Sequence, residues 1–383
     1  MRIGLNLLYL IPGIVGGTET YARGLLRGLR QIKPDYEFVV FVNREAAGLI
    51  ADDDPAFKKV VCPVYASNRK NRYYFEQVRL RRHVEQYKID LLHSLAYTSP
   101  LFLPGPAIVS IPDLNFKAFG NSMPLVRSLM LRLIVRQAVL RSSKVITISN
   151  FSREEILRQY HIAPEKVIVT HLAADNGELD DKVNQKSMNA QALSDSYQPY
   201  IMAFSSPTVN KNLSRLIKAF LEAKKKYNLA QKLLLIGHRY PIAEDMRKCS
   251  ENEDIVWTGY IERGALLEIL RRADFMIYPS FYEGFGLPVL EAMVEGVPVV
   301  CSNAASIPEI VGDAGIYFDP FSIEDMSACI ARVAGNPALR QELRLKGIKN
   351  VDRFSWQQTA AQTVAVYEQV LQNWNGRHLS AAG

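Results

Sequence analysis

Short apolar runs alternate with longer segments of helical periodicity along most of the chain. In the first half, the runs that predict strands are residues 3–10, 38–42, 89–93, 107–111, 145–148 and 167–171. In the second half, they are residues 200–204, 233–236, 255–258, 275–279 and 297–301. Continuous apolar strands separated by helices are typical of parallel sheets, which crossover helices bury on both faces. The pattern therefore predicts two consecutive α/β domains.

A polar stretch without periodicity separates the two series of strands and predicts a linker at 177–198. We therefore expect one Rossmann-like domain over 1–176 and a second over 199–353. The last segment, 354–376, has apolar residues at helical spacing and is predicted to be one long helix. The residues predicted to share its apolar face are Ala360, Val364, Tyr367, Val370 and Leu371.

The segment that follows the apolar run at 275–280 combines a Gly-rich turn with a helix start. It reads Glu283-Gly-Phe-Gly-Leu-Pro-Val-Leu-Glu291. Pro288 suits a first helical turn, and the amides of the turn before it form an anion site suited to phosphate. Carboxylates repel a pyrophosphate, so Glu283 and Glu291 are expected to bind sugar or ribose hydroxyls. The segment predicts a nucleotide-sugar site; a structural turn with two solvated carboxylates is the alternative.

Residues 278–293, with Gly296-Val-Pro-Val-Val300 after them, resemble the C-terminal signature of family 4 glycosyltransferases. Those are retaining enzymes of the GT-B architecture, an α/β fold with two Rossmann-like domains whose parallel sheets face a central cleft. Their last helix crosses back to the N-terminal domain. A Glu-x7-Glu pair is the family hallmark, and it implies that Glu291 holds the ribose and Glu283 the donor sugar. The residues whose amides would hold the diphosphate are Gly284, Phe285, Gly286 and Leu287.

The loop at 204–213 resembles the family's loop that grips the diphosphate. Lys211 takes the position of the family's Lys, which implies that it neutralises the leaving group. Ser205 and Asn210 stand where the family often has Arg, and Ser205 is retained as a substrate-binding candidate. Another cation is needed for the diphosphate charge, and Arg263 and Lys117 are the candidates.

Two loops of the first domain also match the family in part. Gly16 and Gly17 follow the first strand without the GxGxxG spacing of a dinucleotide site, and in the family a Gly-Gly loop here faces diphosphate and acceptor. Pro112 stands where the family has His, and Asp113 is kept, so Asp113 is expected to position an acceptor hydroxyl. His93 ends a predicted strand and is expected to be a structural core residue.

Composition and motif spacing argue against a disulfide-rich protein, a membrane-spanning protein and a metal-dependent enzyme. The four cysteines are far apart and lack metal-ligand spacing, so they read as reduced core residues of a cytoplasmic protein. No apolar stretch is long enough to span a membrane. Asp52-Asp-Asp54 offers a DxD pattern, but it follows a helix-like segment and is expected to be an exposed loop, with no bound metal.

Charge is concentrated in the first half of the chain. Residues 1–176 contain 24 Lys and Arg against 15 Asp and Glu, and the remainder contains 22 against 24. Basic residues gather at 69–82 and at 124–144, where Arg132 and Arg136 are predicted to share one helix face. Such a helix could rest on an anionic membrane surface; the alternative is a packed helix with a solvated Arg face. No basic stripe interleaved with stacking aromatics supports a nucleic-acid partner.

The resemblance implies a retaining, metal-independent glycosyltransferase without a cofactor. We expect it to move a hexose of the mannose or glucose type from a GDP- or UDP-linked donor. The expected acceptor is a glycan or lipid-linked sugar of cell-envelope polysaccharide, such as lipopolysaccharide, and the expected location is the cytoplasm, peripherally on the membrane. The alternatives are a catalytically impaired GT-B scaffold that binds a partner, and another GT-B enzyme such as a phosphorylase or a sugar-nucleotide epimerase.

Overall fold

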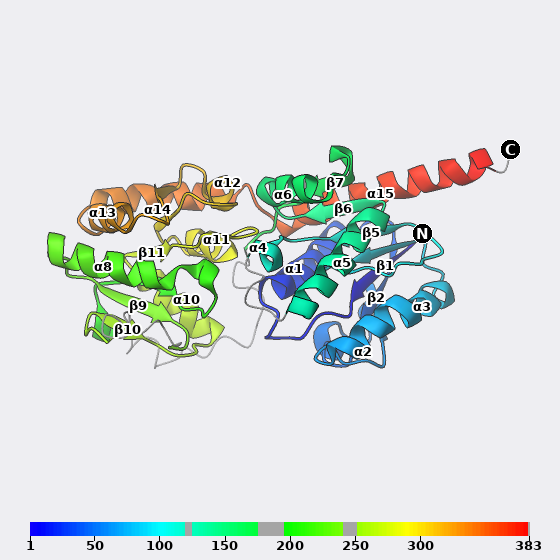
Figure 1. The fold of residues 1–383 in the computed structure, drawn as a ribbon, viewed down its shortest axis with the longest axis horizontal. Coiled ribbons are helices and arrows are strands. Elements are labelled where there is room, and N and C mark those ends of the chain that lie inside the picture. The colour runs from blue at the N-terminus through cyan, green and yellow to red at the C-terminus, as the bar shows by residue number, and fades with distance from the viewer. Residues whose placement is uncertain (119–124, 175–194, 240–250, 382–383) are drawn as a thin grey trace. The chain divides into compact units, whose positions relative to one another are not determined.

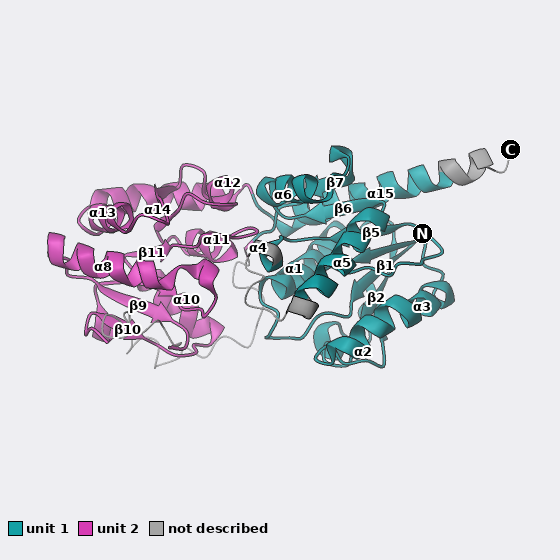
Figure 2. Cartoon of the chain, in the orientation of Figure 1, with its two compact units in different colours: residues 1–173, 354–383 teal, residues 174–353 magenta. Residues whose placement is uncertain are grey.

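The computed structural model describes residues 1–118, 125–174, 195–239 and 251–381. It divides into two compact units, shown in Figures 1 and 2: unit 1 contains residues 1–173 and 354–383, and unit 2 contains residues 174–353. Each unit is built on a parallel sheet with helices, the two-domain α/β fold that the sequence predicts. Most of the expected linker at 177–198 lies outside the described residues.

Within the part of unit 1 that the structure describes, the sheet has seven strands in the order β3-β2-β1-β4-β5-β6-β7, all parallel. Its strands are β1 (Arg2–Leu7), β2 (Glu37–Val42), β3 (Phe57–Val61), β4 (Leu91–Ser94), β5 (Ala107–Ser110), β6 (Lys144–Thr147) and β7 (Val167–Val169). The helices of this unit are α1 (Gly17–Ile32), α2 (Arg69–Tyr74), α3 (Leu80–Gln86), α4 (Asn115–Ala118), α5 (Leu125–Arg141), α6 (Asn150–Tyr160) and α15 (Trp356–Ala381). A π-helical turn, η2 (Phe75–Arg79), joins α2 to α3.

The strand register shows which helices share a face of this sheet. Val39, Leu92 and Val145 point to one face, because each is linked to the next through paired strands. The α2–α3 segment packs on that face through a core that includes Phe75, and α5 and α6 pack on it through a core that includes Val135. The opposite face meets α1 and α15.

Helices α1 and α15 come from opposite ends of the chain and pack closely through two glycines. A side chain at Gly24 would meet the Trp356 ring at 2.1 Å, and one at Gly28 would meet the Trp356 carbonyl oxygen at 2.1 Å. The residues expected on the apolar face of the last helix, such as Ala360 and Tyr367, are all buried, which confirms that part of the expectation. The last helix therefore belongs to the core of unit 1.

In the described residues of unit 2, the sheet has six strands in the order β10-β9-β8-β11-β12-β13, again all parallel. Its strands are β8 (Tyr200–Phe204), β9 (Lys232–Ile236), β10 (Ile255–Trp257), β11 (Phe275–Tyr278), β12 (Val299–Ser302) and β13 (Gly315–Phe318). Its helices are α8 (Leu213–Tyr227), α10 (Arg263–Arg272), α11 (Leu287–Val294), α12 (Ile307–Val311), α13 (Ile323–Ala334) and α14 (Pro337–Val351). Two hydrophobic clusters, one on each face of the sheet, form its core.

The structure corrects several local expectations. Strands β3 and β13 were not expected, and both lie at sheet edges. In β3 two lysines, Lys58 and Lys59, interrupt the apolar pattern, whereas β13 is a run of only four residues that are mostly half-buried. The helix-like segment before Asp52 is only a short 3-10 turn, Ala47–Leu49. Asp52 and Asp53 are exposed, as expected of this loop, but the Asp54 side chain is only 8% exposed and pairs with Arg30. No helix among the described residues is long and apolar enough to cross a bilayer.

The close approach of α1 to α15 generates a stability prediction. Replacing Gly28 with Ala would raise helix propensity, but the new methyl group would collide with a backbone atom that cannot rotate away. We expect Gly28→Ala to lower the free energy of unfolding by about 1–3 kcal/mol, as overpacked cores do. Urea denaturation measures this, with Gly48→Ala as the matched control, because nothing lies within 4 Å of a side chain there. Equal stability of the two variants would contradict the packing described here.

A buried histidine under α15 generates a second prediction. The His93 ring nitrogens lie 2.8 Å from the Tyr367 hydroxyl and 2.8 Å from Ser110 Oγ, and burial lowers the pKa of His93 to about 3. Below a pH of about 6.5 His93 binds a proton in the unfolded chain, whereas in the folded protein it stays neutral. His93 should therefore cost about 1.4 kcal/mol of stability per pH unit as pH falls from about 6.5 towards 3.

Urea denaturation of the wild type and of His93→Gln at several pH values between 7.5 and 5 would test this, since the other titrating groups are common to both proteins. The variant should lose stability less steeply as pH falls. Parallel slopes would mean that His93 is protonated in the folded protein.

Candidate functional site

The candidate site of unit 2 lies where the central strands of its sheet end. Parallel strands direct their carboxyl ends to one edge, where α/β proteins bind ligands. The loop after β8, residues 205–212, and the loop after β11, residues 279–286, both leave from this edge. These loops contain Lys211 and Glu283, which are 72 residues apart in the sequence.

Lys211 and Glu283 form an ion pair. Lys211 Nζ lies 2.6 Å from Glu283 Oε1 and 3.0 Å from the Tyr278 hydroxyl, and both charged side chains are largely buried. Burial by itself lowers the pKa of Lys211, but Tyr278 and the Glu283 carboxylate outweigh it and raise that pKa above its ordinary value. Lys211 is therefore a fixed positive charge with a partner on the opposite loop.

Two asparagines position Lys211 between them. Asn210 Nδ2 donates to the Tyr282 carbonyl, and the Asn210 carbonyl accepts from the Phe281 amide. Asn212 adopts a left-handed conformation, and its Nδ2 donates to the carbonyls of Pro279 and Pro320. Asn210 therefore joins the two loops instead of taking the charged role of the family's Arg.

The Gly-rich turn at 283–286 is fixed by hydrogen bonds from Ser306 and leads directly into α11. Ser306 Oγ donates to the carbonyls of Glu283 and Phe285. Gly286 has φ of 109°, a conformation that favours glycine, and α11 begins at the next residue, Leu287. The amides of Val289 and Leu290 bond the Gly286 carbonyl, so an anion would be bound by the amides that precede them.

The other expected residues of this unit have partners within the protein. Glu291, one turn into α11, has Oε1 3.5 Å from an Arg263 guanidinium nitrogen. Arg263 therefore places a positive charge at this edge, as one of the two cation candidates. Ser205 Oγ donates to the His238 carbonyl at 2.8 Å, which ties its loop to the end of β9. The side chain of the other candidate, Lys117, lies outside the described residues.

The expected residues of unit 1 lie in two loops of its own sheet. Gly16 has φ of 56° and is the N-cap of α1, which begins at Gly17. Nothing lies within 4 Å of a side chain placed at Gly16, so a ligand could approach the backbone there. The loop is fixed by Glu19, whose carboxylate accepts from the Gly13 amide and pairs with Arg23.

Asp113 and His93 both have structural partners in unit 1. Asp113 Oδ1 accepts from the Tyr97 hydroxyl at 2.9 Å and from the Asn115 amide at 3.0 Å, so it fixes the turn that leads into α4. His93 is completely buried with both nitrogens hydrogen bonded, which confirms its expected structural role. Pro112 is buried beside Asp113 and has no side-chain donor.

Sequence reasoning missed the residues that orient this site. Tyr278 ends β11 and contacts Lys211, whereas Asn212 and Ser306 hold the two loops. Asn on both sides of Lys211 is the one local signal that could have indicated a fixed loop. Ser306 gives no such signal, because its role depends on a fold that brings α12 under the turn.

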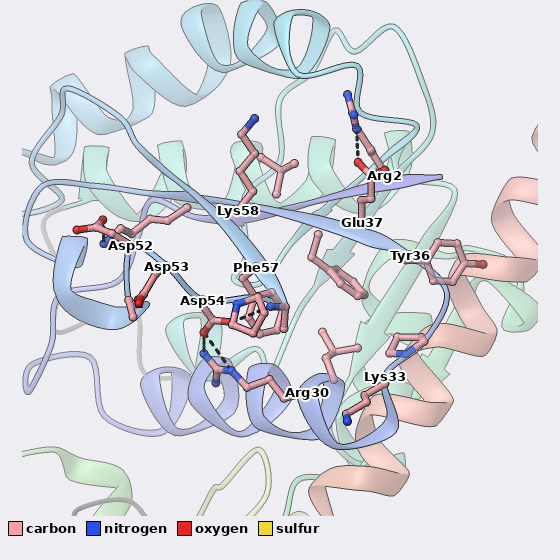
Figure 3. A pocket seen from close by; sticks show the side chains of 18 of the residues that line it. Arg2, Arg30, Lys33, Tyr36, Glu37, Asp52, Asp53, Asp54, Phe57 and Lys58 are labelled. Carbon is pink, nitrogen blue, oxygen red and sulfur yellow. Dashed lines mark hydrogen bonds and ion pairs between the residues drawn. The ribbon is translucent and has the colours of Figure 1, made fainter.

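A hollow of about 1340 Å³ at the outer edge of unit 1 is a poor alternative site. Figure 3 shows that several of its charged side chains pair with one another: Arg30 with Asp54, and Arg2 with Glu37 at 2.6 Å. Lys59, also in its lining, pairs with Asp52 at 2.7 Å. Within the described part of the chain, no three His, Cys, Asp or Glu side chains gather as a metal site requires.

Two family models match the chain, one in each half. The model described as "Glycosyltransferase Family 4" matches residues 15–176, and the model described as "Glycosyl transferases group 1" matches residues 184–350. Between them they span most of the chain, including every site residue described above.

Two curated relatives are mannosyltransferases by name. "O-antigen chain mannosyltransferase B" of Escherichia coli is 28% identical over 289 residues, which are 74% of this chain and 76% of the relative. "MMP alpha-(1->4)-mannosyltransferase" of Mycolicibacterium hassiacum is 29% identical over 235 residues, 60% of this chain. The match spans only 54% of that relative.

Solved glycosyltransferase structures share the fold over nearly the whole chain. Sucrose-phosphate synthase from Thermosynechococcus elongatus has a TM-score of 0.72 at 18% identity and covers 97% of this chain and 100% of its own. WaaG, a glycosyltransferase involved in lipopolysaccharide biosynthesis, has a TM-score of 0.67 at 16% identity. The match covers 95% of this chain and 99% of the WaaG chain. Family models, relatives and fold agree, and the chain belongs to the family 4 glycosyltransferases, which have the two-domain GT-B fold.

Proposed function

We propose that this glycosyltransferase is a retaining hexosyltransferase that uses a GDP- or UDP-linked hexose of the mannose or glucose type. The observation that carries the proposal is the Lys211–Glu283 pair, 2.6 Å apart, beside the start of α11. A diphosphate needs a fixed cation and backbone amides, and a sugar needs a carboxylate acceptor. The names of the mannosyltransferase relatives support the choice of hexose.

In this proposal the donor binds at the carboxyl ends of the strands of unit 2, between the loops that follow β8 and β11. The amides of Gly286 and Leu287 and the Lys211 ammonium bind the diphosphate, and Glu291 accepts from the ribose hydroxyls. Glu283 accepts from hydroxyls of the hexose. Arg263, which lies 3.5 Å from Glu291, contributes the second positive charge that Ser205 cannot supply. The acceptor is a glycan or lipid-linked sugar of cell-envelope polysaccharide, as the relatives' names suggest.

The proposed chemistry needs neither a metal nor a cofactor. The bond from the anomeric carbon to the phosphate oxygen breaks, and the acceptor oxygen bonds the same face of that carbon. The acceptor proton passes to the departing phosphate oxygen. Lys211 and the α11 amides stabilise the charge that develops on the leaving group, which is the role a divalent ion has in other transferases. Gly16 and Gly17 line the route to the acceptor, and Asp113 positions its hydroxyl.

Glycosyl transfer with a panel of GDP- and UDP-hexoses tests this function directly. We expect a GDP- or UDP-linked hexose to be consumed, the product to keep the donor's anomeric configuration by NMR, and activity to survive exhaustive EDTA treatment. Inversion would refute the retaining mechanism. Activity that is lost with EDTA and restored by Mg²⁺ would refute metal independence, and no transfer from any donor would favour a binding scaffold.

The Lys211–Glu283 pair predicts opposite effects of two substitutions on nucleoside diphosphate binding. Lys211→Met removes the cation and leaves a carboxylate beside the phosphates, so affinity should fall by a factor of 10–100, about 1.5–3 kcal/mol. Glu283→Gln removes the competing anion and frees Lys211, so affinity should hold or rise by up to about tenfold, while hexose transfer falls. Calorimetric titration with GDP and UDP measures both.

Asp113→Asn provides the matched control, because Asp113 lies in unit 1 and has no proposed contact with the nucleotide. Its nucleotide affinity should equal that of the wild type, while transfer falls because the acceptor is misplaced. If Glu283→Gln weakened nucleotide binding as much as Lys211→Met, the two side chains would act as one structural unit and the proposed roles would be wrong.

A further inference from the structure

Helix α5 of unit 1 exposes large apolar side chains on the side turned away from the sheet. Its inner residues Val135, Ala138 and Val139 are buried in the core. Leu129 and Met130 are each 56% exposed, and Leu133 is 53% exposed. Apolar side chains of this size are normally buried, and a contiguous exposed group of them marks an interaction surface.

The same helix is basic and contains no acidic residue from Leu125 to Arg141. Arg132, Arg136 and Arg141 are exposed. Among the described residues neither Arg132 nor Arg136 has an acidic partner. Arg132 and Arg136 are both exposed, as expected for two residues that share a solvated helix face, and exposed apolar residues such as Leu133 lie on the same helix. The outer side of α5 is therefore mixed apolar and cationic.

This surface continues onto neighbouring elements of the same face of unit 1. Phe102, in the loop between β4 and β5, is 61% exposed and lies under the Arg141 guanidinium, 5.4 Å from ring centroid to cation. The side-chain amide of Gln77, in η2, donates to the Ser99 carbonyl and accepts from the Leu101 amide of that loop. The loop therefore connects α5 to η2.

The α2–η2 segment adds the same kinds of side chain. Tyr74 is 56% exposed and Val78 is 52% exposed, and the Arg79 guanidinium lies 5.8 Å from the centre of the Tyr74 ring. We call Tyr74, Val78, Phe102 and the exposed residues of α5 the α5 face. Helices α2 and α5, which carry most of these residues, are labelled in the teal unit of Figure 2.

We propose that the α5 face rests on an anionic lipid bilayer. Leu, Met and Phe side chains would enter the boundary between headgroups and acyl chains, and the Arg side chains would bind lipid phosphates. Arg side chains that lie between apolar ones suit this boundary, because their long stems extend back to the headgroups. Because the helix has no acidic residue between Leu125 and Arg141, its charge complements an anionic lipid surface and not a surface of mixed charge. The proposal is independent of the sugar and nucleotide assigned above.

Co-sedimentation of the full chain with vesicles tests this, using phosphatidylcholine vesicles with and without phosphatidylglycerol and with no acceptor lipid present. The wild type should bind the anionic vesicles and not the neutral ones. The double variant Leu129→Glu with Leu133→Glu should bind at least about tenfold more weakly. Arg132→Gln with Arg136→Gln should weaken binding about fivefold per residue and flatten its dependence on salt.

The matched control replaces two exposed apolar residues of α14 in unit 2, Leu345→Glu with Ile348→Glu, at 60% and 48% exposure. It should bind as the wild type does. All variants change exposed side chains and should keep the wild-type melting temperature. Equal binding to neutral and anionic vesicles, or equal loss in the control, overturns the proposal. So does self-association that the Leu129 and Leu133 variants abolish without any vesicle binding, since the α5 face would then contact a second copy.

Discussion

Every strand in both sheets runs parallel to its neighbours, and the placement of each candidate residue follows from that constraint. Parallel strands need a crossover after each one, so the loops that leave their carboxyl ends all emerge at one edge. In unit 2 this brings the loop with Lys211 to the loop with Glu283 although the sequence separates them widely. In unit 1 the Gly16 loop leaves the end of β1 at Leu7, and the Asp113 loop leaves the end of β5 at Ser110.

The charge pair between those two loops is costly to bury and is therefore closely supported. A buried ion pair offsets its desolvation only with good geometry and further hydrogen bonds. Lys211 has that support from Tyr278 on one side and from the loop held by Asn210 and Asn212 on the other. A polyanionic ligand that displaced Glu283 from Lys211 would replace one charge-assisted contact by others. Lys211 would keep an anionic partner, and the Glu283 carboxylate would exchange Lys211 for the hexose hydroxyls proposed above. A site of this kind can therefore be stable both empty and occupied.

The sequence was sufficient where a local pattern determined the structure. Continuous apolar runs identified the central strands, and Gly286 followed by Pro288 marked the start of α11 within one residue. Strand β3, with Lys58 and Lys59, was missed because edge strands are only half buried. The Lys211–Glu283 contact and the exposure of Leu129 could not be inferred, since both depend on which segments the fold brings together and which it leaves uncovered.

The packing of α15 on α1 has a consequence for how the protein folds during synthesis. The core of unit 1 includes His93 and Tyr21 at one end of the chain and Tyr367 at the other, and the ring of Trp356 lies over Gly24. Domains generally fold as units in the order in which they leave the ribosome. Here residues 174–353 are continuous and can fold while residues 1–173 still lack their last helix. The unit made first is completed last, and until then part of its apolar surface is available to chaperones.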